Sequence, residues 1–193
     1  MFKNLLYPKN ISSGTGEVIY IALQSWFASI AKPDGMLITS SHSFYSDKGF
    51  LQVKATPQKN SASGKSSGEL GLNNNQYSIQ GFIAGSYLEQ HSLLRNLLNK
   101  PLVVIVPDAN DSTVFYQVGN EDTPAYIKPD FSTGTSKDGA KGYSIDTSSS
   151  NSALALYRGT ISISPDEVSL LLALMIDDLD YLINELEDTI DVE

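Results

Sequence analysis

Short runs of β-branched and aromatic residues recur along the first 163 residues of the chain. In the run 113–119, Val114, Tyr116 and Val118 occupy alternate positions, which is the period of two expected of a strand with two different faces. We predict strands within 17–30, 36–40, 50–55, 76–84, 101–106, 113–119, 143–147 and 155–163. Turn-forming residues separate these runs at 32–35, 46–49, 108–111 and 137–142. About eight such strands predict a mainly β fold, either a sandwich or an open barrel.

One segment inside this β pattern has the period of a helix. Residues 86–101 open with Ser86 and Glu89, the spacing of a capping box, and Pro101 ends the segment. Its predicted apolar stripe is Leu94, Leu97 and Leu98. We therefore expect one helix packed across a sheet.

The last thirty residues, 164–193, have a helical pattern of their own. Ser164 and Pro165 fit the N-cap and first position of a helix, and Glu167 completes a capping box. Apolar residues then recur at spacings of four and three, at Leu172, Ile176, Leu179, Ile183, Leu186 and Ile190. Such a narrow seam is typical of coiled coils and of helices that dock in a groove. The pattern predicts a long amphipathic helix, which docks either on another chain or on its own domain.

The charge of the chain is concentrated in this terminal segment. The whole chain has a formal net charge of −9, whereas residues 164–193 carry ten acidic residues and no basic ones. Residues 1–163 carry twelve acidic and thirteen basic residues and are nearly neutral, which argues against specific nucleic-acid readout. Acidic groups near a helix C-terminus oppose its dipole, so we expect these to be used, to attract a basic partner or to repel phosphates.

Two segments are predicted as unusually long loops, 57–75 and 120–142. Both are rich in small and polar residues, and loops of about twenty residues in a compact domain are usually functional or disordered. One use for such a loop is to reach a neighbouring subunit and become ordered there. We divide the chain into a β domain, 1–163, and the acidic C-terminal helix, 164–193.

The chain carries few candidates for chemistry. The stretch GKSS at 64–67 matches the end of a phosphate-binding loop, but the pattern requires glycine where Lys59 stands. Residues 108–112 space their oxygen-bearing side chains loosely like a calcium loop, yet they lack its central glycine and distal glutamate and predict a hairpin turn instead. The chain has no cysteine, which excludes disulfides and thiolate metal sites.

Catalysis has little support in the sequence. The only two histidines are His42 and His91, and neither lies in a catalytic motif, although a spatial Ser–His–Asp arrangement is open. We expect no enzyme activity, no cofactor and no metal site. No signal peptide is visible, and no apolar run reaches the roughly 20 residues that span a membrane.

The order of these features resembles a known family. The stretches that carry the resemblance are GTGEVIYIALQSWFASIAKPDG, SHSFYSDKGF, LQVKATP, IQGFIAGSYLEQHSLLRNLLNKPLVVIVPDANDSTVFYQVGNEDTPAYI, STGTSKDGAKGYSI and ALYRGTI, within residues 14–163. Together they resemble virion structural proteins of phages that infect Bacteroidetes, including crAss-like phages. The likeness is greatest to the tail-tube type, which builds rings in the neck and tail.

The resemblance implies a tail-tube-like β-sandwich or barrel whose subunits join sheet to sheet in a ring of six or twelve. It further implies an acidic lumen through which DNA passes non-specifically, a long loop that reaches the next ring, and no catalytic residues. The C-terminal helix departs from that family's minimal fold. We accordingly expect a homo-oligomeric ring in the phage tail or neck, assembled in the host cytoplasm against adjacent tail, neck or portal proteins. The alternative is a β-sandwich receptor- or carbohydrate-binding module of a phage fibre, with some of the ten tyrosines stacking on sugar.

Overall fold

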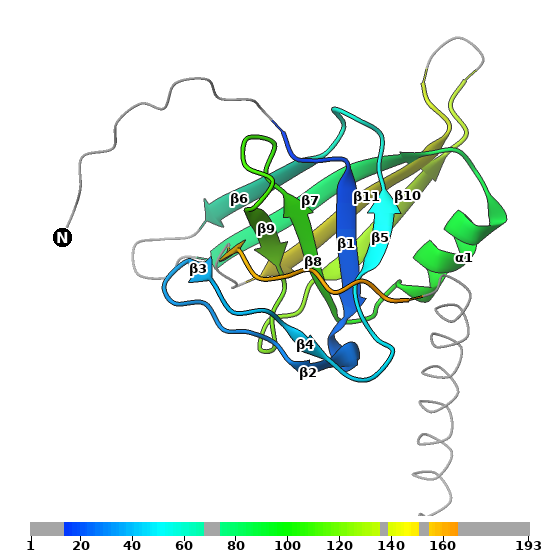
Figure 1. Ribbon diagram of the computed structural model, residues 1–193. Coiled ribbons are helices and arrows are strands. Elements are labelled where there is room, and N and C mark those ends of the chain that lie inside the picture. The colour runs from blue at the N-terminus through cyan, green and yellow to red at the C-terminus, as the bar shows by residue number, and fades with distance from the viewer. Residues whose placement is uncertain (1–13, 68–73, 136–138, 151–154, 166–193) are drawn as a thin grey trace, which may run out of the picture.

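The fold is mainly β, as the sequence predicts. The computed structural model describes residues 14–67, 74–135, 139–150 and 155–165. In these parts of the chain, twelve strands form a six-stranded, a four-stranded and a two-stranded sheet, accompanied by one α-helix (Figure 1). Among the described residues none of the three sheets closes on itself, so they form no closed barrel. Whether the fold is of the tail-tube kind stays a prediction.

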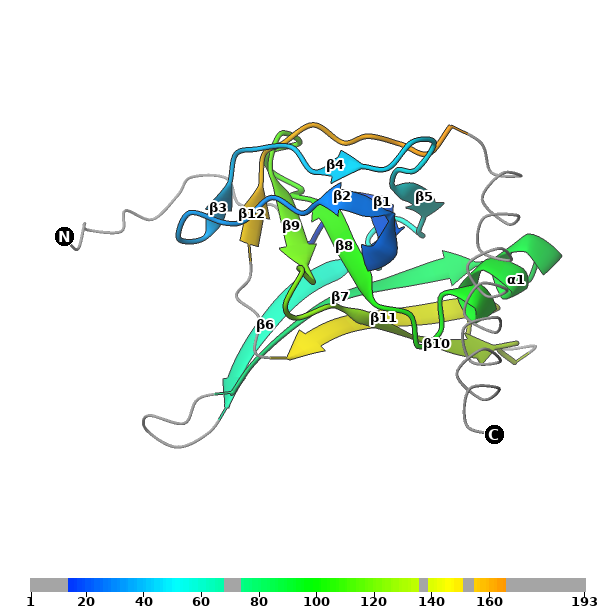
Figure 2. The ribbon, with the colours of Figure 1, turned by 90° about the horizontal axis from the view of Figure 1, so that it is seen from below.

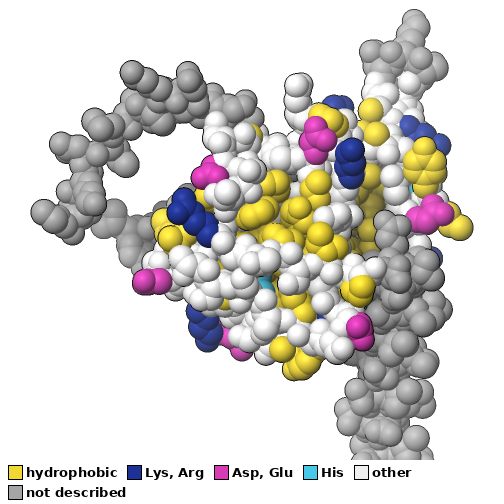
Figure 3. All heavy atoms as spheres, in the orientation of Figure 1, with side chains coloured by type: hydrophobic (Ala, Val, Ile, Leu, Met, Phe, Trp, Pro, Cys, Tyr) yellow, Lys and Arg dark blue, Asp and Glu magenta, His cyan; other side chains and the backbone are white. Residues whose placement is uncertain are grey.

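The six-stranded sheet has the order β3-β12-β9-β8-β1-β5. Its strands are β1 (Val18–Leu23), β3 (Leu37–Ile38), β5 (Leu51–Lys54), β8 (Leu102–Pro107), β9 (Phe115–Val118) and β12 (Ala155–Tyr157). All neighbouring strands are antiparallel except β12 and β3. Residues 102–106 of β8 are buried one after another, because both faces of this central strand are covered. Hydrophobic side chains gather over β1, β5 and β8 in the middle of the face shown in Figure 3.

The four-stranded sheet has the order β10-β11-β7-β6 and is antiparallel throughout. Its strands are β6 (Ser61–Ser67), β7 (Asn74–Ala84), β10 (Tyr126–Ser132) and β11 (Gly142–Ser150). Ile79, Ile83 and Ile145 point from this sheet toward the six-stranded sheet and enter the shared core. The two sheets therefore form the layers of a sandwich, and the far end of the β6–β7 hairpin projects beyond it (Figure 2).

Aromatic side chains close the other face of the six-stranded sheet. The two-stranded sheet, β2 (Phe27–Ser29) with β4 (Ser43–Phe44), lies on that side, joined to β1 by the short 3₁₀ helix η1 (Gln24–Trp26). The rings of Phe27 and Phe44 are tilted by 31° with centroids 4.3 Å apart, and both pack on the buried Phe50. The core thus extends through the sandwich to this small sheet.

The helix α1 (Leu88–Asn96) is shorter than the predicted segment 86–101. Gln90 accepts a hydrogen bond from the Tyr87 backbone N–H at 3.2 Å, so the cap begins one residue later than predicted and does not use Glu89. In the predicted stripe, Leu94 and Leu97 are buried but Leu98 is 43% exposed. The prediction for Leu98 is wrong because the helix has already ended.

Both predicted long loops contain strands, so these two predictions are wrong. The segment 57–75 includes all of β6, and the segment 120–142 includes all of β10. Both are end strands of the four-stranded sheet with one face in solvent, so small and polar residues suffice and no apolar alternation marks them. The strand predicted within 155–163 is shorter than expected, because β12 ends at Tyr157.

Beyond Pro165 the chain lies outside the described residues, and with it the predicted C-terminal helix and its whole seam. The division into residues 1–163 and 164–193 stays a prediction. Within the described ranges, no helix combines the length and the apolar character needed to cross a membrane.

Candidate functional site on the outer face of the four-stranded sheet

The outer face of the four-stranded sheet is unusually rich in hydroxyl groups. Successive side chains of a strand point to opposite faces, and the buried Ile79, Ile83 and Ile145 define the inner one. The register then places on the outer face Ser61, Ser63, Lys65, Ser67, Gln76, Ser78, Gln80, Phe82, Ala84, Tyr126, Lys128, Asp130, Ser132, Ser144, Asp146, Ser148 and Ser150. We call this set the serine face. Its eight serines alternate with two lysines and two aspartates, so it carries no net charge.

A hollow of about 530 Å³ lies on the serine face. Asp146 lies at its centre, opposite Lys128 on β10 and Gln80 on β7. One carboxylate oxygen of Asp146, Oδ1, is buried there without a hydrogen bond from any described residue. On the rim, Lys59 Nζ lies 4.8 Å from the centroid of the Phe82 ring. Since its ammonium and carboxylate groups balance, the hollow offers no strong preference for an anion or a cation.

A second hollow of similar volume surrounds Tyr126 at the other end of this face. The Tyr126 side chain is 44% exposed and the nearby Leu98 is 43% exposed. Amide and hydroxyl groups of Gln76, Asn99, Ser148 and Ser150 also line it, together with Lys128. An exposed ring beside such groups is a surface on which an uncharged polar ligand can lie.

One edge of the four-stranded sheet, along β10, is covered. Just before β10, Ala125 and Leu102 exchange two backbone hydrogen bonds, both 2.8 Å long. Ala125 therefore points its backbone groups away from β11, and by alternation Ile127, Pro129 and Phe131 do so too. Leu98 bridges to Ile127, and Pro129 has no N–H to donate. The Phe131 N–H is thus the one donor that this outward row of β10 can still offer.

The opposite edge, along β6, is open. All seven residues of β6 pair with β7 on one side, from Ser61 opposite Gln80 to Ser67 opposite Asn74. On the other side, no described strand pairs with residues 61–66, and residues 63–66 are exposed. We call residues 61–66 the open edge.

His91 lies between two hydroxyl groups. Its Nε2 is 2.9 Å from Ser86 Oγ, and its Nδ1 meets the Tyr143 hydroxyl. Its ring lies edge-on to Phe131, with centroids 5.2 Å apart. In the described chain neither ring nitrogen contacts a carboxylate, so the Ser–His–Asp arrangement left open by the sequence is not formed here. The contacts instead fasten α1 to β10 and β11.

An exposed apolar cluster surrounds this histidine. Tyr87 is 65% exposed, Leu88 is 80% exposed and Phe131 is 38% exposed. Phe131 also packs on Tyr143, with ring centroids 4.9 Å apart. A cluster of this kind at the end of a sheet is a surface that another molecule could cover.

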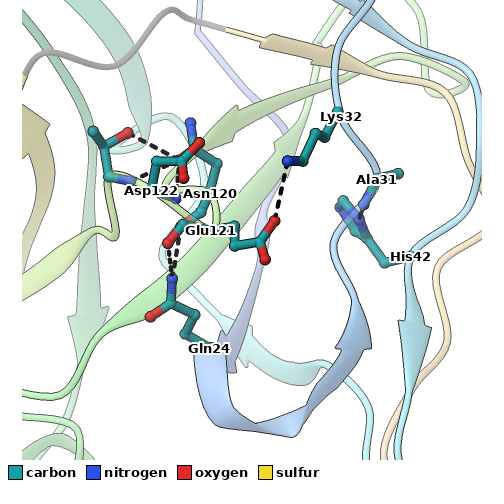
Figure 4. A network of polar contacts seen from close by, with 8 residues as sticks. Gln24, Ala31, Lys32, His42, Asn120, Glu121 and Asp122 are labelled. Carbon is teal, nitrogen blue, oxygen red and sulfur yellow. Dashed lines mark hydrogen bonds and ion pairs between the residues drawn. The ribbon is translucent and has the colours of Figure 1, made fainter.

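His42 is buried and fully hydrogen-bonded, near the polar network of Figure 4. Its Nδ1 accepts the Ala31 N–H at 3.0 Å, so its proton lies on Nε2, which donates to Gln117 Oε1 at 3.0 Å. Gln117 in turn donates to the Gly119 carbonyl at 3.0 Å. Burial lowers the pKa of His42, and the Gln117 bond opposes that shift only in part. His42 is therefore a neutral residue of the core.

Near His42, Gln24 and Lys32 hold the loop that follows β9. Gln24 Nε2 donates to the carbonyl oxygens of Asn120 and Glu121, at 3.0 Å and 2.6 Å (Figure 4). Lys32 and Glu121 form an exposed ion pair at 3.5 Å. These contacts position the loop that carries the chain from β9 toward β10.

The calcium-like stretch 108–112 is a hairpin turn between β8 and β9, as predicted. Asp108 accepts hydrogen bonds from the Tyr116 hydroxyl at 2.6 Å and the Asn110 N–H at 2.7 Å. Asp111 accepts hydrogen bonds from the Thr113 hydroxyl at 2.6 Å and from the Thr113 N–H at 2.9 Å. No group of three or more metal-binding side chains occurs among the described residues.

The remaining predicted positions are distributed as follows. The GKSS stretch lies in β6, not in a phosphate-binding loop. The docking seam Leu172, Ile176, Leu179, Ile183, Leu186 and Ile190 lies outside the described residues. The serine face was missed by the sequence reasoning because two of its four strands read as loops. Neither a protein-family model, nor a curated protein, nor a solved structure matches this chain.

Proposed function

We propose that the protein is a structural virion protein that forms a homo-oligomeric ring of a phage tail or neck, with the serine face toward the channel for the genome. The serine face carries this proposal. Its charges cancel, and its hydroxyl and amide groups remain hydrated, so a polyphosphate chain could pass without the counterion release that drives tight binding. The resemblance implies an acidic lumen, whereas this face is neutral.

The contacts between copies in such a ring differ from a simple joining of sheets. Closing a barrel through the four-stranded sheets would require two open edges, whereas the outer edge of β10 is bridged by Leu98 at Ile127 and interrupted by Pro129. The exposed cluster of Tyr87, Leu88 and Phe131 is the surface that best supports a contact between neighbours. The acidic C-terminal segment would dock on an adjacent ring or on a tail, neck or portal protein.

Native mass spectrometry and negative-stain micrographs of the purified protein test the ring. Multiples of six or twelve copies and annular particles support it, and a strictly monomeric protein at high concentration contradicts it.

The direction of the serine face has a separate test. Replacing Ser144 and Ser150 with lysine should make assembled rings retain DNA at low salt, because two cations per copy would then face the channel. The control is Ser112→Lys, in the exposed turn between β8 and β9. If Ser112→Lys retains DNA equally well, the serine face does not line the channel.

The terminal segment is tested by deletion. Removing residues 165–193 should leave the β domain folded, with an unchanged far-ultraviolet spectrum, and abolish attachment to the partner ring. An insoluble or molten truncated protein would show that the segment belongs to the protein's own core.

The hollow around Tyr126 favours the second candidate, a receptor- or carbohydrate-binding module of a fibre. A stacked sugar would contact the Tyr126 ring and hydrogen-bond to the Gln76 and Asn99 amides. Glycan-array binding that is lost in Tyr126→Ala and kept in Tyr87→Ala would favour this candidate over the ring.

A further inference from the structure

The two edges of the four-stranded sheet are protected very differently. An unpaired edge invites pairing with another strand, and proteins normally blunt it with proline, a bulge, a short strand or a covering loop. The β10 edge has two of these devices, because Leu98 and Leu102 cover its first half and Pro129 interrupts its second. The chain therefore guards this edge against further pairing.

The open edge of β6 has almost none of these protective features. Residues 61–66 contain no proline and no bulge, and the single charge among them is Lys65. Pairing with β7 continues without a register shift along the whole strand. The Tyr77 ring lies directly over Gly64 and fills the space that a side chain would take there. The open edge is thus a preformed row of backbone donors and acceptors flanked by small side chains.

Few other strands of the chain could satisfy this row. The outer strand β5 has only four residues, and Phe50 just before it already exchanges backbone hydrogen bonds with Ser162 and Ser164, at 2.8 Å and 3.1 Å. At the far end of that sheet β3 has only two residues. The partner whose edge matches the open edge in length and chemistry is therefore the open edge of a second copy.

We propose that two copies of the chain pair through residues 61–66, antiparallel about a two-fold axis, so that their four-stranded sheets join into one of eight strands. A two-fold contact uses the same surface on both copies, which fits an edge that has no complement among the strands that the structure describes. An axis at Gly64 places Lys65 opposite Ser63 of the partner subunit, whereas an axis at Lys65 would oppose two ammonium groups. The two-fold contact forms roughly four to six backbone hydrogen bonds. It holds whether or not copies also close into rings.

The absence of cysteine from the chain gives a direct test. Single-cysteine variants at positions 61, 62, 63, 65 and 66 of the full chain are oxidised alone and in pairwise mixtures. In antiparallel pairing about Gly64, opposed residues lie equally far before and after position 64. Disulfide-linked dimers should therefore form above all in the mixtures of Ser63→Cys with Lys65→Cys and of Ala62→Cys with Ser66→Cys. The control is the mixture of Gln52→Cys with Lys54→Cys on β5.

Two results would overturn the proposal. One is a yield of linked dimer no higher than that of the β5 control, with a monomeric mass in light scattering at the same concentration. The other is linkage that appears only after residues 1–13 are removed, which would mean that the chain's own N-terminal segment occupies the edge. A ring without the predicted linkage contradicts this inference and leaves the proposed ring intact.

Discussion

Acid should destabilise this protein through His42 well before its carboxylates titrate. The folded chain holds His42 neutral, with its Nδ1 accepting the Ala31 N–H and its ring stacked on Tyr157 at a centroid distance of 4.5 Å. Burial lowers the pKa of the folded residue, whereas an unfolded histidine has a pKa of about 6.5. Below that pH the unfolded chain binds a proton that the folded chain does not. Stability is therefore greatest above pH 6.5 and falls as the pH drops toward the folded pKa.

The magnitude follows from one proton. While the folded residue stays neutral, the free energy of unfolding falls by up to about 1.4 kcal/mol per pH unit, so it should be about 1.4 kcal/mol lower at pH 5.5 than at pH 7.5. Asp108 and Asp111 do not contribute to this window. Their hydrogen bonds lower the pKa values of both carboxyls, although the partial burial of Asp108 opposes its shift, so their stabilisation is lost only at more acidic pH.

Urea unfolding measures this effect through the chain's one tryptophan, Trp26, whose side chain is only 2% exposed. The variant His42→Gln should lose most of the slope between pH 5.5 and 7.5. It should also lose about 1–3 kcal/mol at pH 7.5, because the partly buried Ala31 N–H no longer has its acceptor. The control Leu98→Ala, which removes no titrating group, should keep the slope. A wild-type stability that is flat over this range, or an unchanged slope in His42→Gln, would refute the reasoning.

Three further predictions concern packing, backbone and ionisation. Leu97→Ala should cost about 2–5 kcal/mol in urea unfolding because this side chain is fully buried. Leu98→Ala should cost under about 1 kcal/mol, and equal costs would contradict the burial pattern. Gly119→Ala should lower the thermal midpoint and cost about 1–3 kcal/mol. Residue 119 has a φ of 90°, and the new Cβ would meet the carbonyl oxygen of Leu102. An unchanged midpoint would show that this turn can relax. The hydrogen bond to Asp108, together with burial, raises the pKa of Tyr116 to about 12. In an ultraviolet titration of Asp108→Asn, the ionisation of one tyrosine should therefore occur at lower pH. An unchanged titration curve would contradict this hydrogen bond.

The sequence predicts the buried strands well because their side chains are selected for the core. β8 and β7 fall within a residue or two of their predicted runs, since each places large apolar groups between layers. The hairpin turn at 108–112 was also predictable, because aspartate and asparagine side chains bond to their own backbone.

The end strands of the four-stranded sheet could not be predicted in this way. β6 reads SASGKSS, and β10 contains Pro129, so neither shows the alternation of a half-buried strand. Their pairing is imposed by β7 and β11, which is information from distant parts of the chain. The candidate site was hidden for the same reason, since its side chains share a face only after the four strands align.

The unlike edges of this sheet also decide how far strand pairing could spread. A chain with two open edges can add copies at both ends without limit, and growth of that kind leads to fibres. Here Leu98, Leu102 and Pro129 block one end. Pairing through the other end therefore stops at two copies. The covered β10 edge thus limits strand pairing and keeps the Ser-rich β6–β7 pair from being extended into a fibre.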